Sequence, residues 1–234
     1  MKIKPVLLFA ASVAFAVAPL VTPPFTGYEA GRFPVEIPRP SIQPAGYAFS
    51  IWGPIYLWLL IHAVFGLARR SDDPAWDVPR LSLSLSLILG AAWLSIAGVA
   101  PVLATVVIWM MLAAALWAFL ATDTHTDRWL LSAPLAIYAG WLSAAAAVSL
   151  GVVLAGYGWL GDTASAVVML GLVLAIAVAV QMRKSAMPLY GLTVIWALAG
   201  VVFANAGPNV TVAVIAASGA VIMVLTLLTT RRKA

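Results

Sequence analysis

Aromatic residues at helical spacing are the strongest chemical signal in this sequence. Trp52 and Tyr56 stand four residues apart, Trp93 lies in the middle of an apolar segment, and Tyr138 and Trp141 are three residues apart in another. An indole offers a flat face for stacking and one N–H group for a hydrogen bond, which suits a planar, largely apolar ligand such as a porphyrin. The same residues could equally fill gaps between helices lined by Gly and Ala. The pattern alone therefore leaves a ligand pocket and simple packing equally open.

His62 is the one titratable residue deep within an apolar run, LWLLIHAVFGL. Its neutral imidazole could coordinate the metal of a haem or a chlorophyll. Alternatively, it forms a hydrogen bond to a Ser, a Thr or a backbone carbonyl of a neighbouring helix. We favour this structural interpretation, because a single His without a second ligand is a weak metal-binding signal.

The rest of the sequence lacks catalytic patterns. There is no cysteine, which excludes disulfides, thiolate metal sites and cysteine nucleophiles. All eight acidic residues fall in expected loops or at segment ends, whereas an ion-coupled transporter normally buries a carboxylate at membrane depth. Paired carboxylates, a nucleophile with a base and a phosphate-binding glycine loop are also missing. We therefore expect a protein that is not an enzyme and requires no metal or cofactor.

Eight apolar segments must position these side chains. The composition, 64% hydrophobic and 9% charged, is that of an integral membrane protein. Most segments reach the ~20 residues with which an α-helix crosses ~30 Å of hydrocarbon. We therefore expect an all-α fold, an eight-helix transmembrane bundle. The segments are about 5–22, 46–68, 81–100, 102–122, 129–157, 163–182, 187–206 and 209–230.

Basic residues fall on alternate connections between these segments. Eleven of the thirteen lie at the two termini or in every second connection: Lys2, Lys4, Arg69, Arg70, Arg80, Arg128, Arg183, Lys184, Arg231, Arg232 and Lys233. The other two, Arg32 and Arg39, lie in residues 23–45. Because cytoplasmic loops carry the excess of Lys and Arg, we expect both termini in the cytoplasm. The net charge of +5 then reflects orientation in a membrane and predicts no nucleic-acid partner.

Residues 23–45 contain six prolines and predict an extended extracytoplasmic loop, either functional or a simple linker. The segment before this loop could also be a secretory signal peptide, since Lys2 and Lys4 precede a short apolar run that ends in small residues. We expect it to be retained as a helix, because the apolar run continues through Pro19, Leu20 and Val21.

Three tryptophans at segment ends, Trp76, Trp129 and Trp159, are expected at the membrane interface, where indoles are enriched. This explanation does not extend to Trp93 or Trp141, which lie within segments.

Four stretches resemble the TspO/MBR family of tryptophan-rich sensory proteins, and in particular its longer bacterial branch with additional C-terminal helices. They are PAGYAFSIWGPIYLWLL at 44–60, the third segment around Trp93, PLAIYAGW at 134–141 and YGLTVIWALAG at 190–200. Three positions depart from the family pattern. Phe49 is three residues before Trp52 where shorter members have four, Gly90 stands where the third helix usually has Asn, and Ser149 stands where the longer branch has Asn.

The resemblance implies a five-helix core, residues 1–157, whose pocket binds tetrapyrrole or sterol-like molecules. Trp52, Tyr56, Trp93, Tyr138 and Trp141 would line this pocket, loop 23–45 would cover it, and Arg32 or Arg39 could pair with ligand carboxylates at its mouth. A porphyrin, haem or chlorophyll-type ligand, a homodimer and a bacterial cytoplasmic membrane are likewise implied. Porphyrin photodegradation would be implied only through the family.

Residues 158–234 would add three helices and a basic cytoplasmic tail. We expect these helices to pack against the core or a partner without lining the ligand site, because they are nearly free of polar side chains. Two other functions remain open. One is a structural or assembly subunit of a larger membrane complex, and the other is a facilitative carrier for an apolar solute, although no internal repeat supports a carrier.

Overall fold

The structure is a computed structural model that describes residues 3–23, 25, 27–28 and 30–231. Lys2, Glu29, Arg232 and Lys233, which entered the analysis of charge, lie outside the described residues. Every regular element within the described ranges is a helix, which confirms the all-α prediction.

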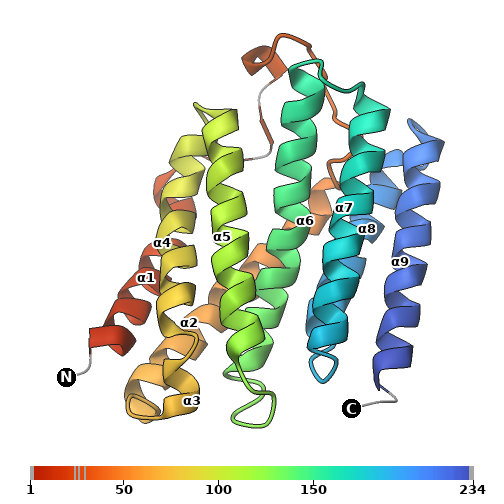
Figure 1. Ribbon diagram of the computed structural model, residues 1–234. Helices are drawn as coiled ribbons and strands as arrows, with labels where there is room; N and C mark the ends of the chain where they lie inside the picture. The colour runs from red at the N-terminus through yellow and green to blue at the C-terminus, as the bar shows by residue number, and fades with distance from the viewer. Residues whose placement is uncertain (1–2, 24, 26, 29, 232–234) are drawn as a thin grey trace.

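Eight helices form the bundle (Figure 1). They are α1 (Ile3–Val21), α2 (Trp52–Arg69), α4 (Arg80–Ala97), α5 (Pro101–Ala121), α6 (Ser132–Gly156), α7 (Asp162–Arg183), α8 (Leu189–Asn205) and α9 (Val210–Arg231). Short helices in the connections are the 3₁₀ helices η1 (Ala30–Arg32) and η2 (Gly46–Ile51) and the single turn α3 (Pro74–Asp77). Within the described chain, seven spans are long and apolar enough to cross a membrane, and α8 is a shorter apolar helix. The predicted eight-helix membrane bundle is therefore confirmed.

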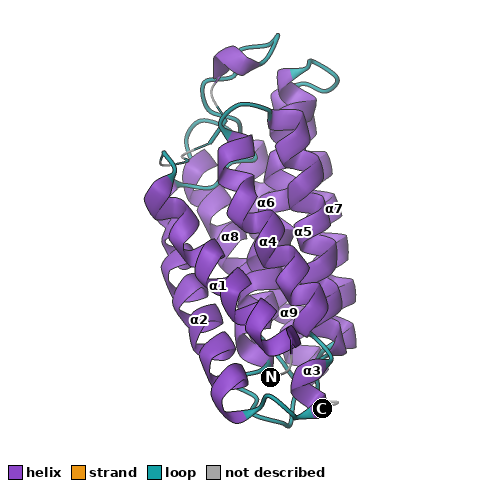
Figure 2. Cartoon of the chain, turned by 90° about the vertical axis from the view of Figure 1, so that its left-hand side faces the viewer, coloured by secondary structure: helices purple, strands orange, loops and turns teal. Residues whose placement is uncertain are grey.

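Helix α6 is the centre of the bundle. Helices α5, α7 and α8 pack along it, and α2 contacts it more briefly. Helices α1, α2, α4 and α5 form one group beside α6, and α7, α8 and α9 form another (Figures 1 and 2). Of the 25 residues of α6, 19 are buried, and many of these are Ala, Gly or Ser. Small residues let neighbouring backbones approach closely, which is the main source of association energy between helices in lipid.

Gly140 marks the closest of these approaches. A Cβ atom at this position would lie 2.7 Å from the backbone oxygen of Tyr190 and 2.9 Å from Cβ of Thr193, both on α8. Only glycine therefore allows α6 and α8 to cross at this distance.

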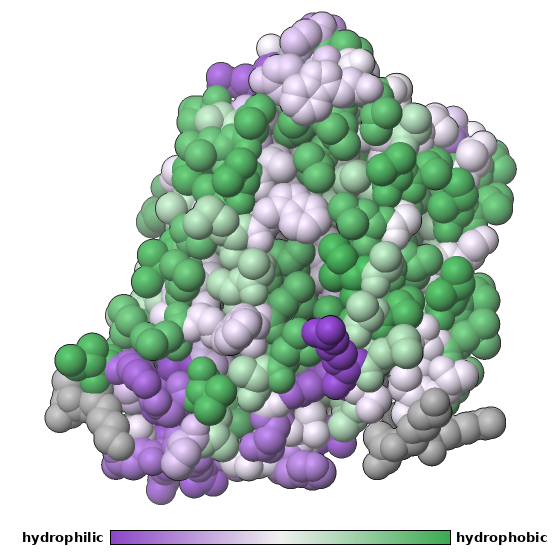
Figure 3. All heavy atoms as spheres, viewed as in Figure 1, coloured by the Kyte–Doolittle hydropathy of each residue, from purple (hydrophilic) through white to green (hydrophobic). Residues whose placement is uncertain are grey.

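The two ends of the bundle differ in charge. Both chain termini and the connections after α2, α5 and α7 lie at one end, which we call the basic end (Figure 1). Its described basic residues include Lys4, Arg69, Arg70, Arg80, Arg128, Arg183 and Lys184. Arg32 and Arg39 belong to the segment at the opposite end, the loop end. On the face shown in Figure 3, most strongly hydrophilic residues gather at the basic end, below a broad apolar band. The charge alternation in the sequence thus corresponds to a separation in space.

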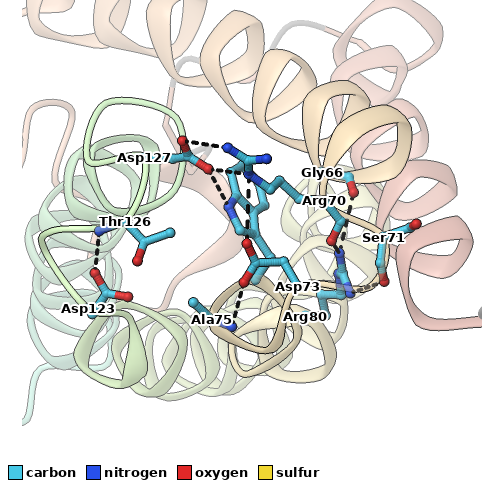
Figure 4. Close-up of polar contacts among 10 residues, drawn as sticks. Gly66, Arg70, Ser71, Asp73, Ala75, Arg80, Asp123, Thr126 and Asp127 are labelled. Carbon is cyan, nitrogen blue, oxygen red and sulfur yellow. Dashed lines mark hydrogen bonds and ion pairs between the residues drawn. The ribbon is translucent and has the colours of Figure 1, made fainter.

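Ion pairs join the connections at the basic end (Figure 4). Arg70, after α2, donates two hydrogen bonds to Asp127, at 2.7 Å from Nε and 3.2 Å from Nη2, and Asp127 lies in the connection before α6. Hydrogen bonds from Arg70 lower the pKa of Asp127, with a further contribution from the indole of Trp76. Asp73 caps α3 by accepting a hydrogen bond from the backbone N–H of Ala75 at 2.9 Å.

Arg80 is 1% exposed and lies at the first residue of α4. Its guanidinium donates to the backbone oxygens of Arg70 at 2.7 Å, Ser71 at 3.1 Å and Gly66 at 3.4 Å, and to Asp77 at 3.2 Å. The carbonyl groups at the end of an α-helix have no partner within the helix. Arg80 therefore satisfies the end of α2 from the start of α4 (Figure 4).

Trp76 is buried inside the protein and cannot present its indole to the membrane interface, so that prediction was wrong. Its side chain is 1% exposed, and its Nε1 donates to Asp127 at 2.9 Å. The indole is buried because it forms a hydrogen bond to Asp127 in another connection. The position of Trp76 at the end of an apolar segment gives no sign of this partner. Trp129 and Trp159, in contrast, are 60% and 70% exposed.

Candidate functional site

An apolar cavity of about 350 Å³ lies in the half of the bundle nearer the loop end. This volume is within the range of pockets that hold small molecules. The described part of its wall comes from all the bundle helices except α9, together with η2 and the segment between α1 and η2. Eight aromatic side chains contribute to it: Phe15, Phe25, Tyr28, Phe49, Trp52, Tyr56, Trp93 and Trp141.

Trp52 and Tyr56 organise one wall. They are one helical turn apart on α2, and their rings stack with centroids 5.3 Å apart and an interplanar angle of 17°. Trp141 on α6 makes a T-shaped contact with Trp52 at 6.1 Å, and Phe15 on α1 makes one with Tyr56 at 5.0 Å. Three helices thus bring aromatic rings to one surface of the cavity.

Other polar groups of the cavity lining form hydrogen bonds within the protein. Trp93 Nε1 donates to the backbone oxygen of Ala104 at 2.8 Å. The hydroxyl of Tyr28 lies 2.7 Å from that of Ser149, which lies 2.6 Å from that of Thr105. Of the lining residues that the structure describes, none is charged.

Two departures from the family pattern have structural consequences here. A Cβ atom at Gly90 would lie 2.5 Å from the ring of Phe15, so the space beside Gly90 is occupied by that ring. Ser149 joins the loop residue Tyr28 to α5 through the hydroxyl contacts with Thr105. Neither position presents an amide to the cavity.

Four of the five predicted pocket aromatics, Trp52, Tyr56, Trp93 and Trp141, line the cavity together. Tyr138 lies outside the lining. It is fully buried beside Phe15, at 5.6 Å between ring centroids, and its hydroxyl lies 2.9 Å from that of Ser86.

The predicted mouth residues Arg32 and Arg39 are exposed at the loop end and are not part of the lining. His62 lies toward the basic end, away from the cavity. Its Nδ1 is 2.7 Å from the backbone oxygen of Leu130, and its ring stacks on Trp76 at 4.8 Å. Among the described residues, no group of three or more His, Cys, Asp or Glu could hold a metal ion.

The C-terminal helices differ from expectation, because α7 and α8 line the cavity. Their contribution is Leu170, Val173, Val194, Ala197, Leu198 and Val201. The close crossing at Gly140 brings α8 against α6 and so against the cavity. Because cavity-facing and lipid-facing residues of these helices are equally apolar, their sequence could not distinguish the two environments.

The same helices hold the second half of the loop. Ser41 is bound by Asp162 at the start of α7, through its backbone N–H at 2.9 Å and its hydroxyl, and its carbonyl accepts from Asn205 of α8 at 2.8 Å. Further along, the N–H of Ala45 donates to the backbone oxygen of Gly200 at 3.0 Å. These contacts position Ile42, Gln43 and Pro44, which line the cavity.

Sequence reasoning missed four aromatic residues of the lining, Phe15, Phe25, Tyr28 and Phe49. Phe15 resembles any other apolar residue of its helix. Phe25 and Tyr28 contact each other at 5.4 Å, and Phe25 also meets Trp93 at 4.9 Å. The presence of Phe25 and Tyr28 in a proline-rich loop was the sequence feature that could have predicted a loop covering the pocket.

Comparison with known families agrees with this architecture. The family model described as TSPO-like protein matches residues 5–229. The chain belongs to the TSPO-like proteins. The matched region of this TSPO-like protein covers all eight bundle helices, including the three beyond residue 157. No curated protein and no solved structure gives a significant match.

Proposed function

We propose that this TSPO-like protein binds a hydrophobic, planar small molecule in the cavity, with a sensory, regulatory or transport role in the membrane. The observation that supports this most directly is the hollow, aromatic-lined cavity of about 350 Å³. A porphyrin-like tetrapyrrole is the ligand class we favour, because flat rings stack on the exposed faces of indole and phenol groups. The alternative, an assembly subunit without a ligand, needs no such cavity.

Binding would not depend on coordination of a central metal by His62, which lies outside the lining. Recognition would instead rest on apolar contact and aromatic stacking. Metal-free and zinc-containing porphyrins of the same shape are therefore expected to bind alike.

A larger side chain at Ala144 should block the cavity. Ala144 is half-buried and lines the cavity on α6. We expect Ala144→Phe to weaken binding of protoporphyrin IX by on the order of tenfold or more, about 1.4 kcal/mol, because the phenyl ring takes the ligand's space. Quenching of tryptophan fluorescence by porphyrin, in nanodiscs with empty discs as blank, measures this affinity.

The matched control is Ala113→Phe, which places the same ring on the exposed face of α5. It should leave the affinity unchanged. Equal quenching in the unaltered protein and both variants would mean that porphyrin only partitions into lipid, and binding in the cavity would have to be abandoned. Ala145→Phe, at a neighbouring lining position, repeats the test if Ala144→Phe does not fold.

We also propose that the basic end faces the cytoplasm of a bacterial cell and the loop end faces outward. The support is the distribution of Lys and Arg, since positive charge near helix ends is retained on the cytoplasmic side. The chain has no cysteine, so single cysteines can be introduced freely. Gly31→Cys is at an exposed position with open space around it, and Ser71→Cys is at the basic end.

A membrane-impermeant maleimide applied to intact cells should label Gly31→Cys and not Ser71→Cys. Labelling of both after permeabilisation controls for reactivity. The reverse pattern in intact cells would invert the orientation.

A further inference from the structure

Arg128 lies at the basic end, in the connection between α5 and α6 (Figure 1). The next residue, Trp129, is 60% exposed and comes just before the apolar span of α6. Exposed indoles at the ends of membrane spans lie among the lipid headgroups. Arg128 is therefore placed at the depth of the headgroups.

Contacts from three parts of the chain hold this side chain in position. Nη2 of Arg128 donates to the backbone oxygen of Ala186, in the connection between α7 and α8, at 2.6 Å. The guanidinium lies over the ring of Trp129, 5.6 Å from its centroid, in a cation–π contact. The backbone oxygen of Trp129 in turn accepts from Nε1 of Trp58 on α2 at 2.8 Å. The guanidinium is thus oriented before any ligand arrives.

One edge of the guanidinium remains available. Nε is buried without an acceptor, whereas Nη1 is not enclosed and forms no hydrogen bond to any described residue. Because arginine carries five N–H donors, Nη1 and the second N–H of Nη2 can still bind an acceptor. Two donors side by side match two oxygen atoms of one phosphate group.

The protein also leaves the charge of Arg128 without a counter-ion. Among the described residues, no carboxylate forms an ion pair with it. Asp127, its neighbour in sequence, is paired with Arg70 at 2.7 Å. The buried Arg80 is paired with Asp77 at 3.2 Å. Arg128 therefore differs from these two arginines, whose charge is used within the protein.

Lys184 adds to the positive charge of the same corner. It lies in the connection that Arg128 contacts, and its Nζ donates to the backbone oxygens of Leu120 and Thr122 at the end of α5. The acidic residue of this corner, Asp123, accepts hydrogen bonds through Oδ1 from backbone N–H groups of its own turn. The corner attracts anions, and Arg128 is the basic side chain there with donors to spare.

We infer that Arg128, lying over Trp129, binds the phosphate of an anionic phospholipid. Lipid phosphate is the anion that the membrane itself supplies at headgroup depth. Basic residues at the membrane surface attract anionic lipids, and basic pockets between helices bind their headgroups. A zwitterionic lipid carries the same phosphate, but its own cation cancels the attraction. This site is separate from the cavity and does not rest on the proposed function.

Native mass spectrometry of the full-length protein in detergent measures the affinity for the first bound lipid. Phosphatidylglycerol and phosphatidylcholine with identical acyl chains are the two probes, since they share the phosphate and differ in net charge. We expect the unaltered protein to bind phosphatidylglycerol on the order of fivefold more tightly than phosphatidylcholine. This preference is the quantity to follow, because a purely structural role of Arg128 would not change it.

Arg128→Gln should reduce the preference to less than about twofold and leave the affinity for phosphatidylcholine nearly unchanged. Arg69→Gln is the matched control. Arg69 is exposed at the end of α2 and forms no ion pair with a described residue, so the variant removes the same charge from the same end. It should keep the preference. Arg128→Lys serves if Arg128→Gln does not fold, and should lose about half of the preference, because one ammonium cannot replace the fork of donors.

The inference is overturned if the unaltered protein binds both lipids alike, or if the preference persists in Arg128→Gln or, where that variant does not fold, in Arg128→Lys. Equal loss in Arg128→Gln and Arg69→Gln would also overturn it, since the net charge of the basic end would then be enough. Glycerol 3-phosphate distinguishes the source of the phosphate. It should not displace phosphatidylglycerol, and displacement would mean that Arg128 binds a soluble phosphate compound in place of a lipid.

Discussion

Replacement of Arg80 by Met is expected to destabilise the protein by about 1–3 kcal/mol, the usual cost of leaving buried hydrogen-bond acceptors without their donor. The guanidinium is 1% exposed and donates to three backbone oxygens and to Asp77. Met fills much of the same volume but donates nothing, so the buried carbonyl of Gly66 and its neighbours at the end of α2 would lose their partner. Reversible unfolding in mixed detergent micelles, followed by circular dichroism, measures the loss.

Arg69→Met is the matched control for this substitution. Arg69 is exposed at the end of the same helix, so its replacement removes the same charge and should change the free energy of unfolding by less than about 1 kcal/mol. A similar loss of unfolding free energy in both variants would mean that the net charge at the basic end determines the stability. The hydrogen bonds of Arg80 would then contribute little.

The second large effect that we expect comes from Gly140→Leu. It should destabilise the protein by about 3 kcal/mol, the upper end of the usual cost of overpacking, because the new side chain meets main chain. A Cβ atom alone would lie 2.7 Å from the backbone oxygen of Tyr190, and a main-chain oxygen within a helix cannot turn aside as a side chain can. Helix α8 would have to move away from α6. Since α8 also lines the cavity, porphyrin affinity should fall together with stability.

Gly171→Leu provides the comparison. Gly171 is exposed on α7 with nothing within 4 Å of a Cβ atom, so the same substitution should be neutral or slightly stabilising, as expected when Gly is replaced in a helix. Unchanged stability of Gly140→Leu would show that α6 and α8 can separate at little cost. The close crossing would then contribute little to the stability of the protein.

Most of the fold was predictable because hydrocarbon imposes simple requirements on a chain. The lengths of the apolar segments were sufficient to predict the eight helices. For α6, the predicted limits, 129–157, differ from the observed Ser132–Gly156 by three residues or fewer at each end. The single turn α3 was missed, since Asp73 and Pro74 favour a helix start as readily as a charged turn. Trp76 was misplaced because its partner, Asp127, lies 51 residues away in another connection.

The site was predictable only where side-chain type carried a signal. Trp52, Tyr56, Trp93 and Trp141 were recognised because large aromatic residues within a membrane span need an explanation. Tyr138 has the same appearance in sequence, yet its hydroxyl is bonded to Ser86 in the core. For α7 and α8 no signal exists, because lipid and an apolar cavity favour the same side chains. Only their packing against α6 shows which face meets the cavity.

The position of Ser41 has a consequence for synthesis of the chain. Its partners Asp162 and Asn205 come 121 and 164 residues later, so they are made long after the loop itself. Helices α1 to α6 emerge from the ribosome first, and at that stage Ser41 lacks both of the side chains that hold it. The cavity is therefore completed only when α8 has inserted. An incomplete chain would therefore leave the aromatic wall of the cavity uncovered on the side that α7 and α8 close in the finished protein.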